Sequence, residues 1–92
     1  MTLETKPLDF TAGVETVDDI RLYLSIFLEE NGAEGFISAL GHLAKMKGMT
    51  EVARSAGISR QNLYRTLTDG GNPNFATVNK VVEALGCKLT IA

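Results

Sequence analysis

The chain has 92 residues, of which 45% are hydrophobic and 22% are charged, and it carries a net charge of -2. This length suits one globular domain with a single modest core and is too short for two domains. No stretch approaches the roughly 20 apolar residues that a membrane span needs, and the N-terminus lacks the basic and then apolar regions of a secretion signal. The single cysteine, Cys87, excludes an intramolecular disulfide and suits a reducing compartment, so we expect a cytoplasmic protein.

The charges divide unevenly along the chain. Residues 1–34 contain two basic and eight acidic side chains, a balance of -6, whereas residues 35–92 contain seven basic and three acidic side chains, a balance of +4. Such a division indicates a basic face for phosphate groups and an acidic segment for a different partner. An ordinary solvated surface also shows charge imbalance, so both interpretations stay open.

The first predicted helix covers Val17–Asn31 and ends at Gly32, because glycine commonly terminates helices in a left-handed conformation. Its apolar residues recur at helical spacing and predict one inward face: Ile20, Tyr23, Leu24, Phe27 and Leu28. Leu22 and Ile26 lie four residues apart, off this stripe. The favoured interpretation of this pair is a broad core face, and the alternative is a contact for a partner chain.

Four further helices are predicted over Phe36–Lys47, Glu51–Ala56, a segment from Ser59 to about Thr68, and Phe75–Leu85. Thr50, Ser59 and Asn74 are the expected N-caps of the last three, since their side-chain oxygens can accept a hydrogen bond from a free backbone N–H. Gly41 is expected to permit close packing of the helix that contains it. Residues 87–91 alternate apolar and polar side chains and predict a short strand, which needs a partner from the N-terminal arm or from another subunit.

These elements together predict an all-α fold with five helices and a short C-terminal strand. Residues 1–16 form an N-terminal arm in this prediction, and residues 17–92 form a single helical domain.

The most informative segment runs from about residue 50 to residue 68, where the spacing predicts a helix-turn-helix. Two short helices must cross at a steep angle through a tight turn, so small Ala53 permits their approach and Gly57 supplies the turn conformation. Ile58, Leu63 and Leu67 then anchor the second helix to the core.

Polar side chains remain on the outer side of this second helix, where they can reach the base edges of duplex DNA. Arg60 can form a bidentate pair with guanine, and Gln61 or Asn62 can form one with adenine. So many polar groups at the amino end of an amphipathic helix are typical of a recognition helix that enters the major groove. An ordinary solvated helix face is the alternative interpretation.

Phosphate contacts are expected around these base contacts. Tyr64 and Arg65 are the side chains placed for them, and backbone amides near Thr50 and near residues 74–77 can cradle phosphate at helix starts. The full set of predicted DNA-binding residues is Thr50, Ser59, Arg60, Gln61, Asn62, Tyr64, Arg65, Asn74 and Thr77.

Residues suited to catalysis or metal binding are scarce. His42 has no His, Cys or carboxylate cluster at metal-ligand spacing, and we expect it to be a surface or half-buried side chain. Cys87 is expected to be a small core residue, because His42 is the only histidine that could serve it as a base. Gly70–Pro73 lacks the Lys-Ser/Thr ending of a phosphate loop. We therefore expect neither enzymatic activity nor a cofactor.

Residues 35–91 resemble the phage-repressor type of helix-turn-helix and, more closely, the probable addiction-module antidote proteins. The segments that carry the resemblance are Ala39–Ala44, Lys47–Ala53, Gly57–Arg60, Leu63–Tyr64, Gly71–Pro73 with Thr77, and Ala84–Gly86 with Leu89. Residues 10–34 match only in outline, as an acidic helix before the core. The resemblance implies a five-helix, phage-repressor-like domain.

The same resemblance implies an antitoxin of a type II toxin-antitoxin pair, which neutralises a small toxin and represses its own operon. DNA contacts carry over only to Ser59, Arg60, Gln61, Asn62 and Arg65, and no residue is assigned to the toxin. The leading hypothesis is therefore a homodimeric repressor and antitoxin whose two recognition helices enter successive major grooves of double-stranded DNA. The alternative is a protein-interaction module that uses the same scaffold without binding specific DNA.

Overall fold

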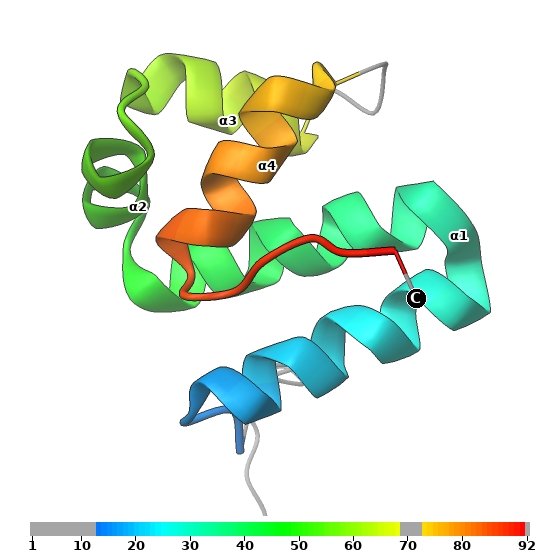
Figure 1. The fold of residues 1–92 in the computed structure, drawn as a ribbon. Helices are drawn as coiled ribbons and strands as arrows, with labels where there is room; N and C mark the ends of the chain where they lie inside the picture. The colour runs from blue at the N-terminus through cyan, green and yellow to red at the C-terminus, as the bar shows by residue number, and fades with distance from the viewer. Residues whose placement is uncertain (1–12, 69–72, 92) are drawn as a thin grey trace, which may run out of the picture.

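The computed structural model describes residues 13–68 and 73–91, and within them the all-α prediction is confirmed. These residues form four helices: α1 (Val17–Lys47), α2 (Met49–Ala56), α3 (Arg60–Thr68) and α4 (Phe75–Ala84), shown in Figure 1. Five helices were predicted, and the difference lies in α1, which continues through Gly32. Residues 1–12 of the predicted N-terminal arm lie outside the described residues.

A break at Gly32 divides α1 into a first half, residues 17–31, and a second half, residues 33–47. Gly32 has φ 68° and ψ -153°, a conformation that only glycine adopts readily. The second half consequently runs back alongside the first, and α1 is a helical hairpin (Figure 1). The predicted stop at Gly32 is thus confirmed as a break in helical backbone, although the second half starts before the predicted Phe36.

Gly35 makes this hairpin tight. A Cβ atom placed on Gly35 would lie 2.6 Å from the carbonyl oxygen of Phe27 and would also overlap the Cβ of Asn31. The two halves of α1 can therefore approach this closely only because residue 35 has no side chain.

The start of α1 is held by a reciprocal cap that the sequence prediction did not include. The Asp19 N–H donates to Thr16 Oγ1 at 3.1 Å, and the N–H groups of Glu15 and Thr16 donate to Asp19 Oδ2 at 2.9 and 3.0 Å. The hydrogen bonds from Glu15 and Thr16 hold the pKa of Asp19 below its ordinary value of 3.8, since they favour the ionised carboxylate.

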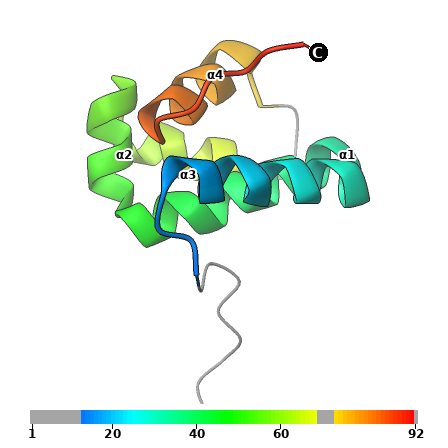
Figure 2. The same cartoon turned by 60° about the horizontal axis from the view of Figure 1, so that its bottom comes forward.

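The core lies between the second half of α1 and helices α2, α3 and α4 (Figures 1 and 2). Its most deeply buried large side chains are Leu40, Leu43, Leu63, Val81, Val82 and Leu85. Only Ile20 and Leu24 of the first half of α1 are buried apolar residues, while Tyr23 and Phe27 are partly buried against the core. No polar or charged residue is buried within the described part of the chain.

Three apolar residues of the first half of α1 depart from the predicted core. Leu28, placed on the inward stripe, is 48% exposed, and Leu22 and Ile26 are 61% and 45% exposed. The broad core face is therefore wrong for this pair, because the rest of the chain packs against one side of this half only.

Two local predictions about helix caps have different outcomes. Asn74 caps α4 as expected, its side-chain oxygen accepting the Ala76 N–H at 2.7 Å. Thr50 does not cap α2: the helix starts earlier, at Met49, and the residue before it is Gly48, which has no side chain to form a cap. Gly48, with φ 104°, ends α1 and also starts α2, so the connection is too short for a capping side chain.

The predicted strand at residues 87–91 is wrong. Leu85 and Gly86 end α4 in a turn, the Cys87 N–H donates to the Val82 carbonyl oxygen at 3.1 Å, and the described tail is irregular. Within the described residues no second strand is available to pair with it, and a lone strand is not stable. The alternation has another cause, because Cys87 and Leu89 pack against the core while Lys88 and Thr90 are exposed.

None of the helices in the described ranges is long and apolar enough to cross a membrane.

Replacing Gly35 by alanine should destabilise the protein by roughly 1 to 3 kcal/mol, because the new methyl group meets the Phe27 carbonyl and the hairpin must open. Gly41→Ala is the matched control on the same half of α1. A Cβ there would meet Leu67 at an ordinary 3.8 Å, so alanine should be neutral or stabilise by up to about 1 kcal/mol. Urea unfolding measures both free energies, and equal effects would contradict the tight hairpin.

The Asp19 cap predicts a pH dependence. Because the folded state lowers the pKa of Asp19, the cap contributes stability above the unfolded pKa and loses it as the pH falls through the folded pKa. Asp19→Asn should therefore lose less stability than the wild type between about pH 6 and about pH 2. Glu29→Gln removes one exposed carboxylate from the same half of α1 without touching the cap, so it should keep the wild-type profile in urea unfolding.

Candidate nucleic-acid interface

The turn between α2 and α3 has the conformation that the sequence predicted. Gly57 adopts φ 74° and ψ 30°, the left-handed region that favours glycine. The Gly57 N–H donates to the Arg54 carbonyl at 3.2 Å and the Ile58 N–H donates to the Ala53 carbonyl at 3.1 Å, which ends α2 and redirects the chain. Two short helices are thereby joined through a turn of a few residues, as a helix-turn-helix requires.

Ser59 caps α3, as predicted. Its Oγ accepts the Asn62 N–H at 3.0 Å, and its carbonyl oxygen accepts the Leu63 N–H at 2.9 Å. The cap satisfies a backbone donor at the amino end of α3, where the remaining free N–H groups give the helix a partial positive charge. An anionic ligand such as phosphate is favoured at such an end.

Two buried leucines orient α3. Leu63 is fully buried and Leu67 is 7% exposed, while Ile58 packs against the core from the preceding turn. The small Ala53, 3% exposed, lies in the α2 face of the same core. The predicted anchors of the motif are therefore confirmed, and α3 packs against both α1 and α2.

All the other predicted reading residues of α3 are exposed: Arg60, Gln61, Asn62, Tyr64 and Arg65. Tyr64 is 58% exposed although it is aromatic, so its ring is not part of the core. No acidic residue lies in α3, and neither of its arginines is in an ion pair with any part of the chain that the structure describes. No described carboxylate therefore prevents either guanidinium group from binding an external acceptor.

The remaining predicted site residues lie at the starts of the neighbouring helices α2 and α4. Thr50 is exposed in the first turn of α2, where backbone N–H groups lack helical partners. Asn74 is exposed at the start of α4 but its side-chain oxygen already accepts the Ala76 N–H, and Thr77 is half-buried. Asn74 and Thr77 thus offer backbone amides more readily than side chains, whereas the Thr50 side chain is accessible.

Arg54 of α2 was not among the predicted site residues. Its guanidinium pairs with Glu51 at 3.1 Å, and both side chains are well exposed. The spacing of three residues between opposite charges on one helix is the sequence signal for such a pair. Exposed pairs of this kind are weak, so Arg54 can exchange Glu51 for a phosphate.

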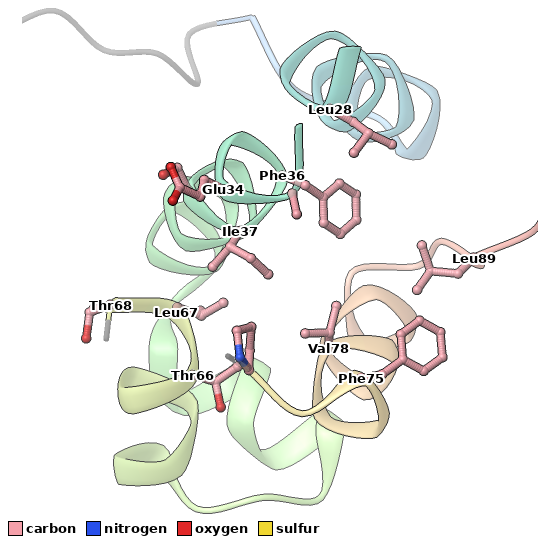
Figure 3. A pocket seen from close by; sticks show the side chains of 13 residues that line it. Leu28, Glu34, Phe36, Ile37, Thr66, Leu67, Thr68, Phe75, Val78 and Leu89 are labelled. Atoms are coloured by element: carbon pink, nitrogen blue, oxygen red, sulfur yellow. The ribbon is translucent and has the colours of Figure 1, made fainter. Parts of the chain in front are cut away.

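A second surface feature is an apolar groove of about 720 Å³ beyond the carboxyl end of α3. Phe36, Phe75 and Leu89 lie around the same space (Figure 3). The Glu34 side chain leaves its helix on the side opposite to Phe36. Phe75 is 72% exposed. The sequence did not reveal this groove, because its walls come from α1, the end of α3, α4 and the tail, which meet only in the folded chain.

His42 and Cys87 are both half-buried, as expected for structural side chains. His42 Nδ1 lies 3.0 Å from the Tyr23 hydroxyl, and its ring packs edge-on against Tyr23 and Phe27, which stack on each other. Burial raises the pKa of the Cys87 thiol, although the positive charge of Arg21 acts in the opposite direction. The raised pKa disfavours a reactive thiolate. Among the described residues no group of His, Cys, Asp and Glu side chains is placed to hold a metal ion.

Comparison with known proteins identifies the family to which the chain belongs. The family model described as "Probable addiction module antidote protein" matches residues 4–92. A protein of Haemophilus influenzae (strain ATCC 51907 / DSM 11121 / KW20 / Rd), named only as uncharacterized, is 42% identical over 91 residues, which cover 99% of this chain and 94% of that protein. No solved structure matches the chain. Since the family model spans nearly the whole sequence, including the capped and anchored α3, the chain belongs to the probable addiction module antidote family.

Proposed function

We propose that this chain is a sequence-specific DNA-binding repressor and the antitoxin of a type II toxin-antitoxin module, which neutralises a cognate toxin and represses its own operon. Family membership supports the antitoxin role, since an antidote implies a toxin that it counteracts. The observation that carries the DNA-binding role is the row of exposed polar side chains on α3, a helix capped by Ser59 and anchored by Leu63 and Leu67.

The size and polarity of α3 suit the major groove of DNA. Its nine residues span about 13 Å, and the groove is about 12 Å wide and admits one helix. In this proposal Arg60 reads guanine with two donors, and Gln61 or Asn62 reads adenine. Discrimination at each such base pair amounts to about 1 to 3 kcal/mol.

Contacts to the DNA backbone would fix the register of α3. Tyr64 and Arg65 follow the base-reading residues on the exposed side of the helix and can donate to phosphate oxygens. Backbone amides at the starts of α2 and α4, near Thr50 and near residues 74–77, supply further phosphate contacts.

The net charge of -2 does not oppose this proposal, because most of the acidic residues that the structure describes lie on or just before the first half of α1. The first half of α1 lies at the opposite edge of the molecule from α3 (Figure 1). The part from residue 35 onward carries a balance of +4. An anionic duplex therefore meets the basic part of the chain.

Specific operators for this class of motif are read by dimers. We propose that two copies of the domain that starts at residue 17 bind a roughly palindromic site, with their α3 helices about 34 Å apart along one face of the duplex. Each copy would then read one half-site, and the symmetry of the operator would mirror that of the homodimer.

Arg60→Ala should weaken binding to DNA from upstream of the chain's own gene by roughly fivefold to 150-fold, the equivalent of about 1 to 3 kcal/mol. Fluorescence anisotropy on a labelled duplex at about 0.15 M ionic strength measures this loss. Lys88→Ala is the matched control, because it also removes one exposed positive charge. Lys88 lies away from α3, because Gly86, two residues earlier, lies against Val17 at the start of α1.

Equal affinity of the Arg60→Ala and Lys88→Ala variants would contradict the assignment of α3 as the recognition helix. Weak binding with little salt dependence in the wild type would favour the other function considered for this scaffold, a protein-interaction module without specific DNA binding.

A further inference from the structure

The outer face of the first half of α1 carries apolar side chains that the fold leaves exposed. Leu22 and Ile26 are one helical turn apart, 61% and 45% exposed, and lie on the side of the helix away from buried Ile20 and Leu24. The core therefore does not explain them. Two adjacent branched apolar side chains on one helix face are suited to insertion into an apolar recess of another protein.

Acidic side chains surround this pair. Asp18 and Glu30 continue the same series at four-residue intervals on either side of Leu22 and Ile26, and Glu29 lies three residues after Ile26. All three carboxylates are exposed. Arg21 is the one basic residue in this half of α1, and it already pairs with Asp18 at 2.9 Å. We call Asp18, Leu22, Ile26, Glu29 and Glu30 the outer face of α1.

The charge of the outer face of α1 restricts its partner. DNA and anionic lipid surfaces are repelled by carboxylates. A second copy of this chain meeting the same face would place identical acidic groups against one another, because a two-fold interface pairs a surface with itself. A protein with a basic rim around an apolar recess satisfies both the carboxylates and the two apolar side chains.

We infer that the outer face of α1 is the surface that binds the toxin, and that the toxin contributes a basic, apolar-centred site to it. The inference rests on the antitoxin role proposed above and assigns that role to particular residues. In this arrangement Leu22 and Ile26 supply most of the affinity, while Glu29 and Glu30 speed association and select a basic partner.

The toxin surface and the DNA surface are separate. Figure 1 places the first half of α1 along one edge of the molecule and α3 along the opposite edge. The second half of α1, which supplies Leu40 and Leu43 to the core, lies between them. Toxin bound at the outer face of α1 consequently leaves the reading residues of α3 accessible, and one chain can hold DNA and toxin at the same time.

The test uses the full chain and, as the probe, the purified product of the gene adjacent to its own. The double variant Leu22→Ala/Ile26→Ala should weaken this complex by about tenfold or more, measured by isothermal titration calorimetry. Leu28→Ala is the matched control, since Leu28 is also in the first half of α1 and is 48% exposed but lines the apolar groove instead. Its affinity should change by less than about threefold.

A charge variant tests the acidic flank separately. Glu30→Lys should slow association with the adjacent-gene product by about tenfold at low salt, and the difference should shrink as salt is added. Glu83→Lys reverses another exposed glutamate, on α4, and should have a much smaller effect. Both apolar and charge variants should bind operator DNA like the wild type, which shows that they fold.

The outcomes separate the surface assignment from the proposed function. If the wild type binds the adjacent-gene product and the Leu22→Ala/Ile26→Ala variant binds it equally well, the outer face of α1 is not the toxin surface although the antitoxin role stands. If the wild type does not bind that product, the antitoxin role and this inference fail together, while the Arg60 experiment on DNA still decides the repressor role.

Discussion

The burial of Leu63 and Leu67 is the contact on which the proposed DNA-binding surface depends. These two side chains are one helical turn apart, and their insertion into the core allows α3 only one rotation about its axis. In that rotation Arg60, Gln61 and Arg65 face solvent. Without this contact α3 could rotate about its axis, and its polar side chains would then face a different direction even if α3 stayed helical. The arrangement of the proposed base-reading residues is thus a consequence of core packing, not of any interaction among these residues themselves.

The break at Gly32 in α1 determines in a comparable way which side chains of the first half of α1 stay exposed. The backbone at Gly32 and the close approach at Gly35 return the chain on itself, so the acidic first half of α1 covers the second half from one side only. One side of the first half is therefore buried through Ile20 and Leu24, while Leu22 and Ile26 stay at the surface. This hairpin places the first half of α1, with four acidic residues and one basic residue, at the opposite edge of the molecule from α3, which has two arginines and no acidic residue.

Two surfaces of opposite charge suit the two roles proposed for this member of the antidote family. DNA requires a basic surface with base-reading side chains, and a basic toxin requires an acidic one with an apolar centre. A single small domain can carry both only if the two lie on different sides of the core. The apolar groove around Phe36 and Phe75 is a third exposed feature, and neither proposed role uses it.

Features that depend on a few neighbouring residues were determined by the sequence alone. Gly57 ends α2, Ser59 caps α3 and Asn74 caps α4, because each of these interactions is completed within about four residues of the chain. The amphipathic pattern of α3 likewise identified which side faces outward. The Thr16 and Asp19 cap belongs to the same class, and the two residues stand at the spacing that signals it.

Only the tertiary structure decided which apolar faces are covered. The periodicity of α1 identifies Leu22, Ile26 and Leu28 as apolar, but their exposure depends on how the chain folds back at Gly32. The alternation at residues 87–91 correctly separated inward from outward side chains, yet a strand needs a hydrogen-bonding partner that the described fold does not supply. Local hydrogen bonds can be inferred from neighbouring residues, whereas burial depends on contacts between segments far apart in the chain.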